Sequence, residues 1–303
     1  MARTKAEGDP TRPGCLKGIA AAAWLATCVA ASAAIAQDGT LQTIRDDVRQ
    51  GPPASPSTPS QQSTPQQSGK GSGGTSDPAS DDDGSWIIPA ACLAGVVVAS
   101  PFWGPHVLLD DDLSQSGYFL KFPYSGGSGY IRPFEVSGLS KPWAVRLDTE
   151  YVATFDRLDN LEGHLLVDSF SRFGLAASWN DLQERLPSGG RDELSIGDCN
   201  LVYRFAQSES AEFRTGLGLN WLNDRGGTDL GFNFTYAADF YPWKPWVVST
   251  GIDWGMLGHA ELFRFRLTTG LVRHGLEPYV GYEYTDIGRA HWNGLVGGLR
   301  LWF

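Results

Sequence analysis

The 303-residue sequence has little positive charge: 24 lysines and arginines stand against 34 aspartates and glutamates, for a formal net charge of −10. Nucleic-acid phosphates are bound by basic surfaces, so this balance argues against a nucleic-acid partner. Charged residues of both signs make up only 19% of the chain.

Cysteines and long apolar runs are scarce as well. Two of the four cysteines, Cys15 and Cys28, fall within the first 36 residues, which leaves Cys92 and Cys199. Two cysteines in such different segments do not make a disulfide framework, so we expect two free thiols. Beyond the N-terminus no run of 18 unbroken apolar residues occurs, and we expect no transmembrane helix in the mature chain.

Aromatic residues and glycine are abundant instead. The chain has 11 tryptophans, 15 phenylalanines and 37 glycines, and aromatics make up 12% of it. With modest hydrophobicity, this composition favours a twisted β structure with aromatic belts over a helical bundle.

Residues 1–36 have the pattern of an export signal. Basic residues come first, an alanine-rich apolar stretch follows, and Ala34-Ile35-Ala36 fits a small-x-small cleavage site. We therefore predict cleavage between Ala36 and Gln37. A lipoprotein signal that ends at Cys28 is the alternative.

Residues 37–85 have the composition of a linker. Of the 30 residues from Gly51 to Ser80, 26 are Ser, Pro, Gln, Gly or Thr. Such a chain cannot bury enough apolar surface to offset its ordering entropy. We predict a disordered tether that reaches a periplasmic partner. One short docking helix over Thr40–Arg49, where three apolar residues have helical spacing, is the alternative.

From Trp143 to Phe303 the apolar residues recur with a period of two. In the first segment Leu147 and Tyr151 point one way, while Asp148 and Glu150 point the other. Nine segments share the pattern: 143–155, 163–179, 192–206, 212–222, 228–241, 246–257, 261–272, 278–286 and 291–303. Many span 11–14 residues, whereas soluble strands average about five or six. Tilted strands of that length cover the apolar band of a membrane barrel.

The chain ends on Phe303, with Leu301 two residues before it and Gly298 three before that. Together with the export signal and the long alternating segments, this ending resembles that of bacterial outer-membrane β-barrel proteins. The resemblance implies an all-β fold, with a single antiparallel up-and-down transmembrane barrel over 143–303 in contact with outer-membrane lipid. It also implies that the C-terminal strand carries the signal for the barrel-assembly machinery. Val296 departs from the pattern, which usually has a polar residue there.

The number of strands must be even in a barrel of this class, and nine segments were counted. We prefer ten strands, with the tenth supplied by Tyr118–Phe134; eight is the alternative. The rest of 86–142 is apolar but broken by prolines, and we expect it to lie against the membrane or under the barrel mouth. If Phe303 ends in the periplasm, the long connection Asn180–Arg191 falls outside and the tight turn Tyr241–Pro245 falls inside.

The inward register is rich in both signs of charge. Charges inside a narrow barrel must be paired, because an orphan charge there costs several kcal/mol. We therefore predict a salt-bridged polar plug, with a narrow charged conduit or small-ligand pocket as the alternative. The predicted network comprises Arg146, Asp148, Glu150, Asp168, Arg172, Asp198, Arg204, Arg214, Asp229, Asp239, Asp253, Arg264, Arg266, Glu283 and Arg300.

The histidines do not suggest catalysis. His164 and His274 are expected near the inner turns and His259 and His291 near the outer rim, without a serine or a metal-ligand spacing beside them. We predict no enzyme, cofactor or metal site. The function predicted is structural or partner-binding, with a narrow channel as the first alternative and a lipid-modifying enzyme as the less favoured one. A water-soluble β domain is the alternative to a membrane protein.

Overall fold

A computed structural model describes residues 39–51, 100–155, 158–186 and 189–303. The predicted export signal, its cleavage site and most of the predicted linker lie outside the described residues, as do 86–99. Among the described residues, no helix is long and apolar enough to cross a bilayer.

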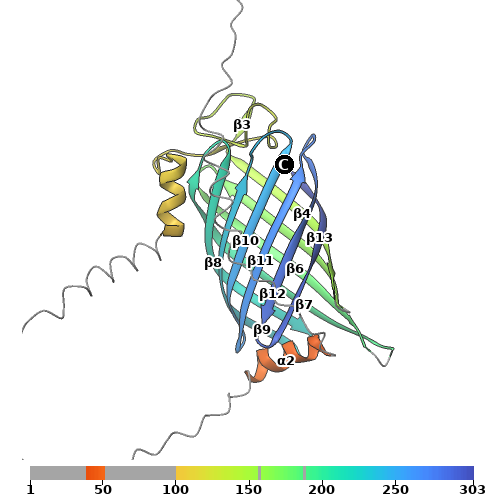
Figure 1. The fold of residues 1–303 in the computed structure, drawn as a ribbon. Coiled ribbons are helices and arrows are strands. Elements are labelled where there is room, and N and C mark those ends of the chain that lie inside the picture. Colours follow the sequence, from red (N-terminus) through yellow and green to blue (C-terminus); the bar gives the residue numbers. More distant parts are fainter. Residues whose placement is uncertain (1–38, 52–99, 156–157, 187–188) are drawn as a thin grey trace, which may run out of the picture. The chain divides into compact units, whose positions relative to one another are not determined.

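Ten antiparallel strands form a closed barrel in which each strand pairs with the next, and the last pairs with the first (Figure 1). Closure is made by residues such as Arg300, which lies opposite Asp148. The strands are β4 (Trp143–Thr154), β5 (Leu158–Ser169), β6 (Phe173–Arg185), β7 (Arg191–Gln207), β8 (Ala211–Asp224), β9 (Gly227–Phe240), β10 (Trp246–Leu257), β11 (Ala260–Leu271), β12 (Leu276–Ile287) and β13 (Ala290–Trp302). The predicted ten-stranded antiparallel barrel is confirmed.

The predicted origin of the tenth strand was wrong. Within Tyr118–Phe134, β1 (Tyr118–Leu120) and β2 (Ile131–Arg132) pair with β3 (Ser140–Lys141) in a separate three-stranded sheet. The additional barrel strand comes from the predicted single segment 163–179, which is part of the hairpin β5–β6. The turn between them is only three residues long and contains apolar and basic residues in place of glycine or proline, so composition did not mark it.

Side chains alternate between the two faces of the barrel wall as predicted. In β4, Leu147 and Tyr151 are 45% and 47% exposed on the outside, whereas Asp148 and Glu150 are 1% and 2% exposed on the inside. The alternation follows from the two-residue repeat of a strand. It gives the barrel an apolar outer surface and a polar lumen.

The two ends of the barrel differ, and we name them by their connections. The C-terminal end carries Phe303 and the connections 170–172, 208–210, 241–245 and 272–275; the loop end carries those between β4 and β5, β6 and β7, β8 and β9, β10 and β11, and β12 and β13. The expected long outer connection Asn180–Arg191 is mostly strand, because β6 continues to Arg185 and β7 begins at Arg191. The loop end therefore has short connections.

Residues 117–141 cover the C-terminal end. Phe119 and Tyr130 are 0% and 2% exposed and belong to an apolar cluster with Tyr241, Val247 and Trp302 of the barrel. Two backbone hydrogen bonds join this segment to the barrel. The N–H of Gly117 donates to the Phe170 carbonyl (3.1 Å), and the N–H of Tyr130 donates to the Glu209 carbonyl (3.0 Å). These covering residues belong to the segment that was predicted to supply the tenth strand, and not to the part of 86–142 that was expected under the barrel mouth.

Helix α2 (Thr40–Gln50) covers the loop end (Figure 1). Disorder was predicted for 37–85, and for these eleven residues that prediction was wrong; the alternative of a short docking helix is what the structure has. Leu41, Ile44 and Val48 lie on one face and are almost completely buried. Eleven residues make a marginal helix in water, so packing on the barrel supplies the stability that helix propensity does not.

Candidate functional site: a charged lumen closed at both ends

Among the described residues, six arginines and ten carboxylic acids of the strands point into the lumen between the two covers. The arginines are Arg146, Arg204, Arg214, Arg264, Arg266 and Arg300, and the acids are Asp148, Glu150, Glu162, Asp168, Asp198, Glu212, Asp239, Asp253, Glu277 and Glu283. Most are under 10% exposed, so they are charges held in a low-dielectric interior.

Arg300 organises the layer nearest the C-terminal end. Its guanidinium donates to Asp148 at 2.9 Å, to Glu277 at 2.7 Å and to the hydroxyl of Ser249 at 3.0 Å. The indole N–H of Trp302 donates to the other oxygen of Glu277 at 2.8 Å. This arginine is 0% exposed, and its donors are directed at acceptors on three other strands.

A second group ties the same layer to the segment that covers it. Arg146 donates to Asp239 at 2.8 Å, and Arg214 donates to the same carboxylate. Arg204 lies 4.7 Å from the centre of the Phe119 ring, in a cation–π contact with the cover. The ion-paired lumen and the cover are thus in direct contact.

The middle of the lumen is built around Glu150. This carboxylate accepts a bond from Tyr279 at 2.6 Å and one from Arg266, and its other oxygen lies 2.9 Å from Nε2 of His164. Gly298 makes room for this group, because a Cβ there would lie 2.5 Å from the Tyr279 ring. The predicted assembly-signal glycine therefore has a packing role as well.

One group of lumen residues has metal-ligand character. Ligand atoms of Glu150, Glu162 and His164 lie within 4.8 Å of one another. Nε2 of His164 lies 2.9 Å from Glu150 and 3.3 Å from Glu162, so an N–H at this one nitrogen contacts both carboxylates. Because Glu150 also accepts bonds from an arginine and a tyrosine, an ion-paired group accounts for this arrangement.

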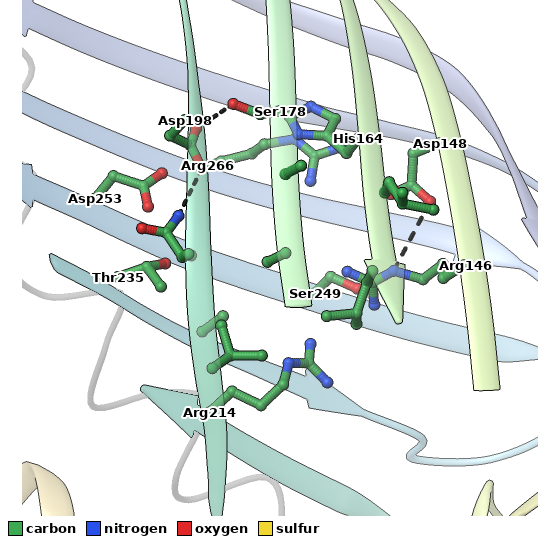
Figure 2. A pocket seen from close by; sticks show the side chains of 18 of the residues that line it. Arg146, Asp148, His164, Ser178, Asp198, Arg214, Thr235, Ser249, Asp253 and Arg266 are labelled. Carbon is green, nitrogen blue, oxygen red and sulfur yellow. Dashed lines mark hydrogen bonds and ion pairs between the residues drawn. The ribbon is translucent and has the colours of Figure 1, made fainter. Parts of the chain in front are cut away.

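A cavity of about 120 Å³ lies between these groups. Figure 2 shows Arg146, Asp148, Arg214 and Asp253 around it, with Asp198 bonded to Ser178. The volume suffices for a few water molecules and the lining offers them polar partners. A hydrated polar interior is what this space supports.

At the loop end, Glu184 caps the N-terminus of α2. Its carboxylate accepts backbone N–H bonds from Gly39 at 3.1 Å, Thr40 at 3.0 Å and Leu41 at 3.0 Å. These N–H groups have no partner within the helix, and a negative charge is favoured by the helix dipole at this end. A barrel side chain thus takes the place of the usual local cap.

Two arginines of α2 meet acids on the barrel rim. Arg45 donates to Asp192 at 2.5 and 2.8 Å and to Asp224 at 2.6 Å. Arg49 donates to Asp224 at 2.6 Å and to Asp229 at 3.0 Å. Asp224 therefore serves both arginines and joins the helix to the hairpin β8–β9.

A third pair has the opposite polarity. Asp47 of α2 is 0% exposed and accepts bonds from the Arg289 side chain at 2.6 Å and from its backbone N–H at 2.8 Å. The Arg289 guanidinium holds the pKa of Asp47 below its ordinary value. The reversed pair fixes the orientation of the helix, because a helix turned end for end would face like charges.

The structure separates the fifteen predicted lumen charges into two sets. Thirteen lie in the lumen. Arg172 instead lies in the β5–β6 turn, where it donates to Asp111 at 2.7 and 2.8 Å. Asp229 lies at the loop end and binds α2. These two predictions of lumen residues were wrong because each lies at a strand end, where the alternation no longer defines a lumen face.

Sequence reasoning missed four lumen residues: Glu162, His164, Glu212 and Glu277. His164 had been placed near a turn, because the β5–β6 hairpin was taken as one segment. Glu277 lies just before the predicted strand start, and extending the period of two from Glu283 would have placed it inside. Glu212 is the second residue of β8, at its predicted boundary.

The two other residues of the predicted assembly signal lie at the edge of the barrel. Phe303 is 55% exposed, and its N–H donates to the Val145 carbonyl at 2.8 Å. Leu301 lies partly exposed on the outer face of β13. Val296, the departure from the pattern, points inward and packs on Val152 and Tyr279.

No protein-family model and no curated protein match the chain. Similar solved structures include the N-terminal β-barrel domain of Pseudomonas aeruginosa OprF, at 12% identity and a TM-score of 0.27 over 53% of this chain and 97% of that one. The KdgM porin is similar at 10% identity and a TM-score of 0.25, over 52% of this chain and 98% of that one. A loop-deleted OmpT, an outer-membrane protein of Vibrio cholerae, is similar at 12% identity and a TM-score of 0.29, over 62% and 76%. The closed ten-stranded barrel is established by the strand order of this chain itself.

Proposed function

We propose that this chain is a bacterial outer-membrane barrel of the structural or partner-binding type, closed to solutes. Support for a lipid environment comes from the outer surface of the strands, which carries large exposed apolar side chains on every side. They include Leu147, Leu161, Leu175, Trp179, Leu201, Leu217, Leu219, Phe232, Trp254, Leu267, Val280 and Leu295. Monomeric soluble proteins rarely expose a continuous apolar belt, and an outer-membrane barrel requires one.

The observation that carries the closed interior is the combination of two covers with a paired lumen. Residues 117–141 pack into one end through Phe119 and Tyr130, and α2 packs into the other through Ile44. Between them, four of the six lumen arginines donate to carboxylates on other strands: Arg146, Arg214, Arg266 and Arg300. A solute would have to displace a cover and also break buried ion pairs, each of which costs several kcal/mol to disrupt.

A narrow channel is the second candidate, and the cavity beside Arg266 and Asp253 favours it. Its volume is about 120 Å³, and a conducting path would need a continuous aqueous route past both covers. An enzymatic role has less support. Among the described residues, no imidazole is hydrogen-bonded to a serine hydroxyl, and His164 is engaged by two carboxylates.

The test combines folding and conductance on the same refolded protein. We expect the full chain in detergent micelles to migrate faster unboiled than boiled, and to give no discrete conductance steps in a planar bilayer. Arg266→Ala removes the arginine that donates to Glu150, and we expect this variant to give no conductance steps either. Conductance steps in the wild type that change in Asp253→Ala would show a channel and refute the proposal. A protein soluble without detergent would refute the membrane location.

Two partners are part of this proposal. Outer-membrane lipid contacts the apolar belt, and the barrel-assembly machinery engages the C-terminal strand through Leu301 and Phe303. Removal of Phe303 leaves the lumen and both covers intact, so we expect slower insertion in cells and an unchanged refolded barrel. Equal insertion with and without Phe303 would contradict the role of this residue.

A further inference from the structure

Helix α2 is a separable element that fills a preformed groove. The helix is bounded by Gly39 and Gly51, whose φ angles of 91° and 78° lie in the left-handed region that glycine tolerates. All its anchors are barrel residues far away in the sequence, so the groove holds it through noncovalent contacts alone. The barrel closes through the pairing of its own ten strands, so the helix is not part of the sheet on which it packs.

The groove is apolar at its centre. Leu41, Ile44 and Val48 are 0%, 0% and 1% exposed, and they pack on barrel residues that belong to the same buried cluster. Those barrel residues are Leu158, Leu182, Leu194, Ile196, Leu222, Leu257, Ala260, Leu262, Ile287, Ala290 and Trp292. Without an occupant, this surface would face water at the mouth of the barrel, and burying it drives the docking of a helix.

Charged residues at the rim of the groove complement the charges of α2. Acids stand opposite Arg45 and Arg49 and the N-terminus of the helix, while Arg289 stands opposite Asp47. An amphipathic helix with arginines one turn apart, an acid between them and its N-terminus at Glu184 complements this rim. The sequence that has this pattern is α2 itself.

We propose that the loop-end groove is a helix-recognition site, that α2 occupies it as a tethered ligand, and that the α2 of a second copy fills it when the chain's own helix is withdrawn. Every copy carries both the groove and the matching helix, and exchange of an identical element between protomers is a low-cost route to a dimer. This inference rests on the proposed partner-binding function and names the partner as a second copy of this chain.

Glycines allow the close approach of helix and groove. A Cβ on Gly258 would lie 2.3 Å from the Val48 carbonyl oxygen, and one on Gly288 would lie 2.7 Å from the Asp47 carboxylate. The backbone N–H of His259 donates to that same Val48 carbonyl at 2.8 Å. The turns of the loop end thus present backbone as well as side chains to the helix.

The first experiment measures binding in trans with a fluorescent peptide of residues 39–51. The receptor is the full chain with Leu41→Asp and Ile44→Asp in its own helix, refolded in micelles and shown to be folded by its unboiled mobility. We expect saturable binding, weakened about tenfold or more by Asp224→Arg in the receptor, because this acid binds two arginines. Asp159→Arg is the matched control, because Asp159 lies at the same rim but bonds to Tyr151 and Arg185.

The second experiment tests whether the α2 of a second copy occupies the groove. A donor chain carries an intact α2 and the groove substitution Asp224→Arg, and it is mixed with the receptor chain. We expect a donor–receptor complex on size-exclusion chromatography, and none in the receptor alone. Peptide binding that is absent, or equally affected by Asp224→Arg and Asp159→Arg, would overturn the recognition site. Peptide binding without a donor–receptor complex would overturn the second copy as occupant.

These outcomes are independent of the closed-barrel proposal. Conductance reports on the lumen, whereas peptide binding and complex formation report on the groove. A conducting barrel that still binds the peptide would refute only the closed interior, and a silent barrel that does not bind it would refute only the groove.

Discussion

Replacing Ile44 by alanine is expected to loosen α2 while the barrel stays folded. Ile44 is 0% exposed and lies in the cluster that joins the helix to the loop end. Removing buried methyl and methylene groups of this size costs about 2–5 kcal/mol, through lost transfer free energy and the cavity left behind. The barrel strands keep their own hydrogen bonds, so this loss falls on the docking of the helix.

Hydrogen exchange of the refolded protein in micelles, followed by mass spectrometry, measures this local opening. A loss of about 2 kcal/mol speeds exchange of the α2 amides by about 30-fold, since each 1.4 kcal/mol is a factor of ten. Gln50→Ala is the matched control, because Gln50 is exposed at the end of the same helix. Unchanged exchange in α2, or faster exchange of the strands to the same degree, would refute the idea that this contact holds a separable helix.

Three further predictions concern single residues. Because Arg289 lowers the pKa of Asp47, this pair strengthens the docking of α2 most above the ordinary carboxyl pKa, and its contribution is lost as pH falls through the lowered one. Asp47→Asn should therefore reduce the acid dependence of α2 hydrogen exchange, and the remainder comes from Asp192 and Asp224, the carboxylates that accept bonds from the arginines of α2. Arg300→Met should lower the free energy of unfolding by about 3–5 kcal/mol, because it leaves buried carboxylates unpaired. Arg185→Met, at a side chain that is 70% exposed, should lower it by less than about 1 kcal/mol. Urea unfolding in micelles measures both losses, and equal values would contradict a buried ion-pair network. Gly258→Val should expose α2 to trypsin, since this residue has φ +56° and no room for a side chain against the helix; unchanged cleavage would count against the close approach.

The two faces of the barrel wall could be predicted well from the sequence, because strand geometry fixes the two-residue repeat of apolar and polar side chains. A strand repeats every two residues, so Leu147 and Asp148 must face opposite sides wherever β4 lies, and one side of a membrane barrel must be apolar. The same reasoning placed Arg146, Glu150 and Arg300 in the lumen. This reasoning failed for Arg172, which lies in a turn, because the alternation of a strand does not determine the direction of a turn side chain.

The sequence could not reveal which charges meet. Glu150 and Arg266 lie 116 positions apart and become partners because β4 and β11 lie in one barrel wall and their side chains meet in its lumen. His164 was predicted near an inner turn, and it contacts two carboxylates in the lumen because residues 170–172 form the turn of a hairpin. Such contacts depend on strand count and on distance across the lumen, which local patterns do not contain.

The sequence by itself determined the class of the protein. Its composition, its long alternating segments and its terminal Phe303 point to an antiparallel barrel with an apolar outside and a charged inside, because these properties follow from residue type and spacing alone. Only the tertiary structure decided that the barrel is covered at both ends. Eleven residues are too few to make a stable helix in water, and the helix exists because strands from around the barrel together build a groove that matches it.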